Sequence, residues 1–199
     1  HDSIREYICN FIMSTLETNL VQPSTGTTLT LGASGDTITV PSGATVSGAL
    51  SNTPSFKVNL ASTQTVSSGS ATLAAFATEL FDTDSAFTNT SSNYKFTVPS
   101  GKAGKYFLNA SLNLRDVSQS QTINFARVSI YKNGSEFASN TFNHSGNYGD
   151  QYTINVSTID NASASDYYQV YGTVTTSDAS DGEFLSDSYR SWFCGNKLI

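Results

Sequence analysis

The sequence predicts an all-β protein, a sandwich or jelly roll of antiparallel strands preceded by a short β-repeat. Three observations predict this class. Twelve Phe and ten Tyr occur beside a single Trp in 199 residues, and aromatic side chains pack well on a pleated surface. Charged residues make up only 13% of the chain, and the helix formers Glu, Lys, Arg and Met are nearly absent for long stretches after residue 20. Alternating apolar and polar runs end in Gly, Asn or Ser turns along most of the chain.

The first twelve residues differ from the rest of the chain. His1–Ile12 are charged and bulky, and they precede the only methionine, Met13. Because they lack the basic and long apolar regions of a signal peptide, we interpret 1–12 as upstream translation or an amphipathic anchor. Residues 13–51 are predicted to form an N-terminal anchor and a β-repeat stalk, and 52–199 a globular head.

The predicted stalk consists of three Gly-centred units, "STGTTLTL", "SGDTITV" and "SGATVSG", whose glycines Gly26, Gly35 and Gly43 lie nine and then eight residues apart. Each unit predicts a turn followed by a short strand. The apolar side chains available for a shared core are few: Leu29, Leu31, Ile38, Val40 and Val46. Strands this short need neighbouring strands or further chains for stability. The alternative is a flexible Ser/Thr/Gly linker.

From Pro54 onward the pattern predicts longer strands. Phe56, Val58 and Leu60 alternate in the first of them, and the following segment supplies Phe76, Leu80 and Phe81 as apolar side chains. The most regular run spans 106–115, where Tyr, Leu, Ala, Leu and Leu alternate with Phe, Asn, Ser, Asn and Arg. This run predicts a half-buried antiparallel strand of about ten residues.

The remaining strands continue this pattern. Ala126, Val128 and Ile130 share one face of a strand that ends at Asn133-Gly134, a dipeptide typical of a type I′ hairpin turn. The runs "QYTINVSTI" and "YYQVYGTVTT" also alternate, and the chain closes with "SDSYRSWFCGNKLI". In this last run we expect Cys194 to be a small buried residue.

Four motifs carry a resemblance to a known family. The segment 56–60 resembles the opening strand of the globular head of complement's first component, subunit q. "YKFTVPSGKAGKYFLNASL" resembles that family's central signature, a Phe-Thr-x-Pro, a Gly turn and a Gly-x-Tyr-x-Phe. "VSIYKNGSEF" resembles its hairpin and "SWFCGNKLI" its closing motif. The resemblance spans Pro54–Ile199, with the motifs in the family's order.

The resemblance implies a ten-stranded jelly roll, shared with tumour necrosis factor, that assembles as a homotrimer and serves recognition rather than catalysis. The collagen stalk of that family is missing, and the Gly-centred repeat takes its place. The N-terminal layout "LGASGDTITVPSGAT" resembles tail-fibre and structural proteins of bacteriophages, particularly those of marine hosts.

Composition argues against several classes of partner. The net charge is −6 and the ten Lys and Arg residues are scattered singly, so we expect no nucleic-acid binding. No apolar run approaches the roughly 18 residues needed to span a membrane. Cys9 and Cys194 lie 185 positions apart, which is neither a disulfide framework nor a zinc spacing.

Two acidic clusters could bind a metal ion or take part in catalysis. Asp178, Asp181 and Glu183, and separately Asp82 and Asp84, could supply oxygen ligands to calcium, although acidic turns are commonly just solvated. No other cofactor is expected. Nothing pairs two carboxylates as a glycosidase requires. Of the two histidines, His1 and His144, the second lies in a Gly/Asn-rich loop without a nucleophile elbow. We therefore predict that the protein is not an enzyme.

The segment 140–152, "NTFNHSGNYGDQY", is the predicted ligand-binding loop. Tyr and Asn side chains can stack on sugars and hydrogen-bond to them at low entropic cost. The candidate residues are Asn143, His144, Asn147, Tyr148 and Tyr152. The segment near Tyr167 and Tyr168 is a second candidate contact surface. Equally, these aromatic residues could pack between subunits or cap the barrel.

The sequence as a whole predicts a non-enzymatic virion structural protein on the virion surface. It would be a homotrimeric short fibre or decoration of a bacteriophage, joined to other virion proteins through its N-terminal segment. The head would present its loops to a host cell-surface glycan, with three copies adding up weak contacts. Two alternatives stay open: a capsid decoration protein without receptor binding, and a secreted lectin-like recognition protein.

Overall fold

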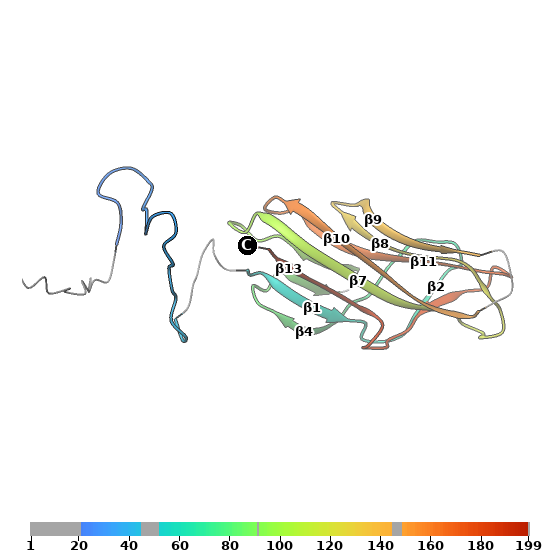
Figure 1. The fold of residues 1–199 in the computed structure, drawn as a ribbon. Helices are drawn as coiled ribbons and strands as arrows, with labels where there is room; N and C mark the ends of the chain where they lie inside the picture. Colours follow the sequence, from blue (N-terminus) through green and yellow to red (C-terminus); the bar gives the residue numbers. More distant parts are fainter. Residues whose placement is uncertain (1–20, 45–51, 91, 145–148, 199) are drawn as a thin grey trace, which may run out of the picture. The chain divides into compact units, whose positions relative to one another are not determined.

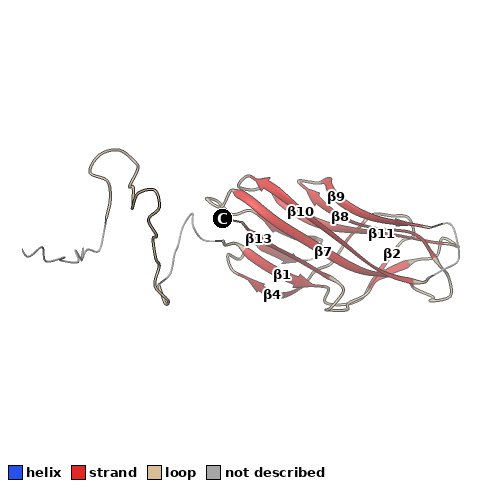
Figure 2. Cartoon of the chain, viewed as in Figure 1, coloured by secondary structure: helices blue, strands red, loops and turns tan. Residues whose placement is uncertain are grey.

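The computed structural model describes residues 21–44, 52–90, 92–144 and 149–198 (Figure 1). The chain divides between Thr45 and Val46 into an N-terminal unit and a C-terminal head, and each is described by itself. The described residues form only strands, turns and loops (Figure 2). Accordingly, that part of the chain contains no helix long and apolar enough to cross a membrane.

Two tight turns organise the described part of the N-terminal unit. The amide of Asp36 donates to the carbonyl of Ala33 and that of Ala44 to the carbonyl of Pro41, both at 3.1 Å. The third residue of each turn is a glycine with positive φ, 97° at Gly35 and 91° at Gly43. A type II turn requires such a backbone at this position, which glycine adopts without strain. The turns predicted at Gly35 and Gly43 are therefore present, whereas the chain only bends around Gly26.

The strands predicted between these turns are not formed by residues 21–44. Leu29, Leu31, Ile38 and Val40 are instead exposed, at 42, 59, 62 and 52%. The physical reason is that a short strand in one chain has no neighbour to accept its backbone hydrogen bonds or cover its side chains. The fifth candidate, Val46, lies outside the described residues. An intertwined β-stalk stays a prediction that depends on other chains.

The described part of the head contains thirteen strands. Ten have four or more residues: β1 Ser55–Asn59, β4 Thr78–Asp82, β5 Phe87–Thr90, β6 Asn93–Thr97, β7 Gly104–Asp116, β8 Ile123–Lys132, β9 Ser135–Asn143, β10 Gln151–Ala162, β11 Tyr167–Thr176 and β13 Trp192–Lys197. Three are shorter: β2 Gln64–Val66, β3 Thr72–Leu73 and β12 Gly182–Phe184.

The strands form two antiparallel layers, as predicted for a jelly-roll sandwich. Sheet A contains the five longer strands in the order β4-β1-β13-β7-β10. The short strand β12 pairs with the end of β7 that β13 does not cover, and β2 pairs with β12. Sheet B has the order β5-β6-β11-β8-β9, with β3 added beside β11. Three short strands therefore supplement the ten longer ones.

The strand predicted over 106–115 is β7, which lies in the middle of sheet A. Its inward side chains, Tyr106, Leu108, Ala110, Leu112 and Leu114, are all 0% exposed. The strand was predicted to be half-buried, but its outward face is also partly buried, at Ser111 and Asn113. The loop between β12 and β13 covers this end of β7, where Ser191 Oγ accepts the amide of Asn113 at 3.0 Å.

The predicted hairpin joins β8 to β9. Asn133 and Gly134 form its two-residue loop with φ values of 51° and 82°. Both values are positive, as the type I′ turn requires, so this prediction is confirmed.

Two apolar assignments were wrong. Leu80 and Phe81 lie on β4 and are 50% and 48% exposed, because β4 is an edge strand with one neighbour; Phe76 is buried at 1%. Cys194 is half-buried rather than buried, because it alternates with the inward Phe193 and points to the outer face of sheet A.

Gly195, in the closing motif, sits in a closely packed part of sheet A. A Cβ at this position would lie 2.7 Å from Leu108, 2.9 Å from Phe56 and 3.0 Å from the carbonyl oxygen of Phe107. We predict that Gly195→Ala lowers the free energy of unfolding by about 1–3 kcal/mol through overpacking. The measurement is chemical denaturation. Ser62→Ala, at an exposed loop position, should change it by less than about 0.5 kcal/mol, and equal effects would contradict the packing argument.

Candidate functional site

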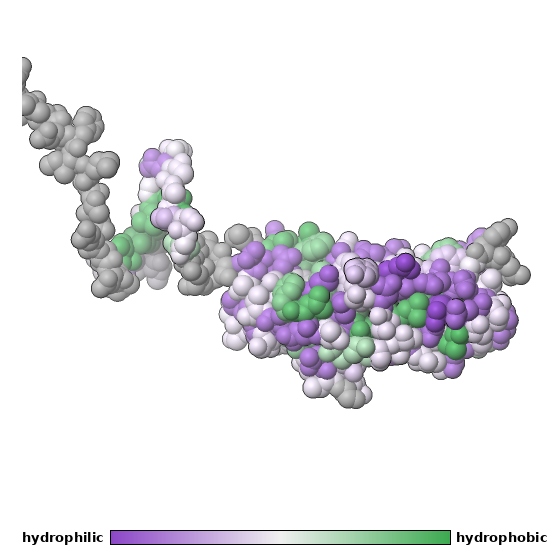
Figure 3. Space-filling view, turned by 90° about the horizontal axis from the view of Figure 1, so that it is seen from below, coloured by the Kyte–Doolittle hydropathy of each residue, from purple (hydrophilic) through white to green (hydrophobic). Residues whose placement is uncertain are grey.

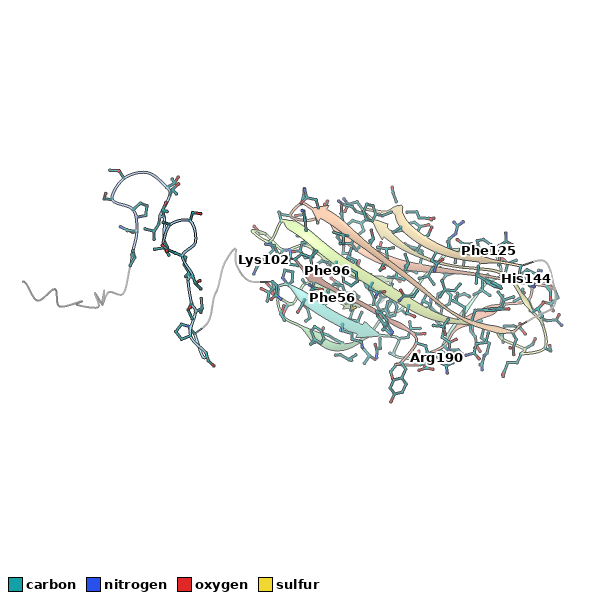
Figure 4. The ribbon with its side chains drawn as sticks, in the orientation of Figure 1. Phe56, Phe96, Lys102, Phe125, His144 and Arg190 are labelled. Atoms are coloured by element: carbon teal, nitrogen blue, oxygen red, sulfur yellow. The ribbon has the colours of Figure 1, made fainter. Side chains whose placement is uncertain are left out.

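The head has two distinct ends. At the start of β7, the amide of Lys197 donates to the carbonyl of Pro54 at 3.0 Å and that of Leu198 to the carbonyl of Lys105 at 2.8 Å. The chain therefore enters and leaves the head at one end, which we call the base. The other end of β7, at Asp116, lies about 40 Å away for a strand of this length. We call it the distal end; Figure 4 places His144 and Phe125 there, opposite Lys102.

The carboxylate of Asp116 holds the distal loops together. Asp116 is 0% exposed. Its Oδ2 accepts hydrogen bonds from Ser118 Oγ at 2.6 Å and from the amides of Ser120 and Gln121, both at 3.1 Å. Its Oδ1 accepts one from Ser180 Oγ, in the β11–β12 loop, at 3.2 Å. A buried carboxylate with four donors from two loops fixes the geometry of both.

The hydrogen bonds of Asp116 also determine its ionisation. Burial acts to raise the pKa of its carboxyl group, but the hydrogen bonds from Ser118, Gln121 and Ser120 outweigh burial, and the pKa is lowered overall. Donors that stabilise the charged form favour ionisation. Asp116 is therefore an anion at neutral pH.

Backbone hydrogen bonds join a third loop, the one between β9 and β10, to the same cluster. The amide of Asp116 donates to the carbonyl of Asp150 and that of Ile123 to the carbonyl of Gly149, each at 2.9 Å. The amide of Val117 donates to the carbonyl of Asp181 at 3.2 Å. Three loops far apart in the sequence thus form one connected surface at the distal end.

The predicted ligand-binding residues that can be described lie at this end. Asn143 is exposed at the end of β9. The amide of His144 donates to the carbonyl of Asn124 at 2.8 Å. Tyr152 stacks on Phe142 with ring centroids 4.2 Å apart and is partly buried against the core. Tyr152 therefore packs against Phe142 and the core. Asn147 and Tyr148 lie outside the described residues.

The three carboxylates predicted for calcium do not converge. Glu183 is buried and pairs with Arg115. Asp178 and Asp181 are exposed, and Asp178 Oδ1 accepts the amide of Ser180 at 2.9 Å. Among the described residues no group of three or more His, Cys, Asp and Glu side chains could hold a metal ion. We therefore do not propose calcium at these positions.

The outer face of sheet A is a flat surface that the sequence did not single out. Its middle three rows, taken from the strand register, contain Lys57 as their one charged side chain. Ile159 and Phe81 on this face are 60% and 48% exposed. Trp192 on β13 lies on the same face, in the row of Ser111 and Asn59, with Lys57 Nζ 5.6 Å from its ring centroid. Figure 3 shows the head from below the view of Figure 1, with apolar patches between hydrophilic residues.

The strict alternation along 106–115 predicts which residues of β7 lie on this face. The alternation does not say that β10, β13 and β1 bring Ile159, Trp192 and Lys57 beside them. That arrangement follows from strand order, which is a tertiary property.

Comparison with known proteins supports the fold. No protein-family model matches the chain, and no curated protein sequence does. Murine APRIL matches with a TM-score of 0.51 and 9% identity over 73% of this chain and 98% of the APRIL chain. Eiger TNF from S. frugiperda and the globular domain of zebrafish complement 1qA each give a TM-score of 0.48 at 12% identity. They cover 73% and 74% of this chain, and 91% and 98% of their own. The likeness to APRIL shows the jelly-roll fold.

We predict that Asp116→Asn loosens the distal loops and lowers the free energy of unfolding by about 2–3 kcal/mol at pH 7, because an amide group would face hydrogen-bond donors in a buried site. The measurement is urea denaturation as a function of pH. Since the folded-state pKa of Asp116 is lowered, its stabilising effect is complete above about pH 4, the ordinary Asp value, and is lost as the pH falls through the folded-state pKa. The difference between wild type and variant should therefore shrink on acidification; a constant difference would contradict this role.

Proposed function

We propose that this protein is a non-enzymatic structural protein of a bacteriophage virion, a homotrimeric short fibre or surface decoration that attaches to host-surface glycan. The head would act as the recognition module and the N-terminal unit as the attachment to other virion proteins. The observation that carries this proposal is the separation of the two ends of the head.

That separation suits a fibre. Because Pro54 and Leu198 lie at the base, a support that holds the chain from its N-terminal side leaves the distal end pointing outward. The distal loops are fixed by the buried Asp116 and include the exposed Asn143. Binding residues on loops held by a rigid scaffold are typical of recognition proteins.

The outer face of sheet A supports the homotrimer. The middle rows of this face contain one charge, Lys57, and the exposed Ile159 and Phe81. Exposed apolar side chains are costly to leave in water, and their burial is the usual driving force for association. Virions contain many copies of their structural proteins, so a second copy of the same chain is the partner that we propose for this face. Trimerisation would also place three distal ends side by side, so that weak contacts with a glycan add through effective concentration.

The repeat in the N-terminal unit supports a multi-chain stalk. Its turns are in place, while Leu29, Leu31, Ile38 and Val40 remain exposed in one chain. Three chains brought together by their heads would supply both the missing strand neighbours and a common interior for these side chains.

The trimer can be tested by light scattering coupled to size-exclusion chromatography. The expected mass is three times the chain mass of 21.2 kDa. We predict that Ile159→Lys shifts it to the monomer mass, because a lysine at the subunit contact would bury an unpaired charge. Tyr189→Lys, at a loop position 90% exposed, is the matched control and should leave a trimer. A monomeric wild-type protein would refute the assembly.

The division of labour can be tested by deletion. Removing residues 13–51, which lie partly outside the described residues, should leave a folded trimeric head that no longer attaches to the virion. Cryo-electron microscopy of particles assembled with either version would measure this and would distinguish tail from capsid attachment. A truncated head that still decorated the particle would contradict the anchor assignment.

A further inference from the structure

The outer face of sheet B carries a cluster of three tyrosines. Tyr167 and Tyr171 point the same way along β11, four residues apart. Tyr131 on β8 lies opposite Gln169, and its ring centroid is 4.3 Å from that of Tyr171. All three side chains are half-buried. Their rings therefore form part of an outward surface, which we call the tyrosine cluster.

The phenols of the cluster affect the ionisation of Tyr171. The pKa of Tyr171 is raised, first because its phenol is partly buried and then because the phenols of Tyr131 and Tyr167 are near. Three neutral phenols at one place can each donate and accept a hydrogen bond.

The tyrosine cluster is flanked by cations. Lys95 Nζ lies 4.8 Å from the ring centroid of Tyr167, and Lys95 forms none of the ion pairs between described residues. Arg127 lies 5.3 Å from the ring centroid of Phe125 and pairs at 3.3 Å with Glu136, in an exposed contact. Arg127 is therefore paired, whereas Lys95 is a cation beside the cluster that no described carboxylate pairs, on a chain whose net charge is −6.

Small polar side chains complete the surface. In the register of β11, β8 and β9, Tyr171 lies beside Ser129, which is buried, and one strand further beside the exposed Ser139; Thr173 lies beside Arg127 and the exposed Thr141. Neighbouring strands are about 4.8 Å apart, so side chains with hydroxyl groups recur across the sheet within reach of one sugar ring. The surface thus combines aromatic faces, hydrogen-bonding groups and a single uncompensated cation.

We propose that the tyrosine cluster binds a polysaccharide that contains uronic acid. Sugar rings present C–H groups on one face, which pack against the negative face of an aromatic ring, and hydroxyls at their edges, which the Ser, Thr and Gln side chains can bind. A uronate has one negative charge per ring, which matches the uncompensated charge of Lys95. This inference rests on the proposed attachment to host glycan and deepens it: it names the class of glycan and a contact surface on the side of the head.

Affinity electrophoresis of the full chain in native gels tests this proposal. The gels contain polygalacturonate, neutral dextran or dextran sulfate. Retardation is expected in polygalacturonate and not in dextran, and added salt should weaken it because the Lys95 charge is exposed to screening. Two results would overturn the proposal. The first is equal retardation in dextran sulfate that the tyrosine variants do not change, because it would indicate simple charge attraction. The second is the absence of retardation in polygalacturonate.

Variants with matched controls locate the site. Tyr171→Ala should weaken polygalacturonate binding about tenfold, equivalent to about 1.4 kcal/mol, and Lys95→Gln should reduce both binding and its salt dependence. Tyr171→Phe keeps the ring and should retain most of the affinity, which covers the case in which the alanine variant does not fold. The controls, the exposed Tyr189→Ala and Lys105→Gln, should bind like wild type. Equal weakening by the controls would overturn the assignment.

Two further outcomes separate this inference from the proposed function. If Tyr171→Ala changes the trimer mass in light scattering, the cluster is a contact between chains and the polysaccharide site is refuted. If virions adsorb to host cells while the purified chain fails to bind polygalacturonate, the attachment function stands and the uronate site fails. Loss of virion adsorption by Tyr171→Ala, with the trimer intact, would support both.

Discussion

Phe56 is the residue on which the sandwich most depends, because its ring joins the two sheets. It comes from β1 in sheet A and stacks on Phe96 and Phe87 of sheet B, with ring centroids 4.6 and 5.5 Å apart. Phe193 of sheet A meets it edge-on at 4.9 Å. Aromatic pairs of this kind contribute about 0.5–1.5 kcal/mol each beyond their buried area. Gly195 is required beside them because these rings leave no room for a side chain.

The packing of that core decides what the rest of the head can do. Once the inward residues of β7 and β8 fill the interior, the alternate residues must form the two outer faces. The middle of sheet A then presents Asn and Ser side chains with the exposed Ile159 and Phe81 and one charge, Lys57. Sheet B presents tyrosines with adjacent cations. The distal loops are held by the buried Asp116 carboxylate instead, because loops have no ladder of backbone hydrogen bonds.

The sequence predicted local structure well where a residue type has a direct backbone consequence. Asn133-Gly134 gave the hairpin turn, and Gly35 and Gly43 gave turns in the N-terminal unit, since each needs positive φ. It predicted burial less well at the sheet edges. Leu80 and Phe81 read as core residues, but only strand order reveals that β4 has one neighbour. The acidic residues around Asp178 were predicted as one group, whereas Glu183 is buried in an ion pair with Arg115 and lies apart from the exposed Asp178 and Asp181.

The sequence by itself therefore determined the all-β class, the positions of the turns and the inward face of β7, because alternation and turn chemistry are local properties of the chain. Only the tertiary structure decided which outward residues become neighbours. Tyr131 and Tyr171 are forty residues apart and touch because β8 pairs with β11 in one register. Asp116 contacts the β11–β12 loop for the same reason: Ser118, Ser120 and Gln121 follow it directly in the sequence, but Ser180 reaches it only in the folded sandwich.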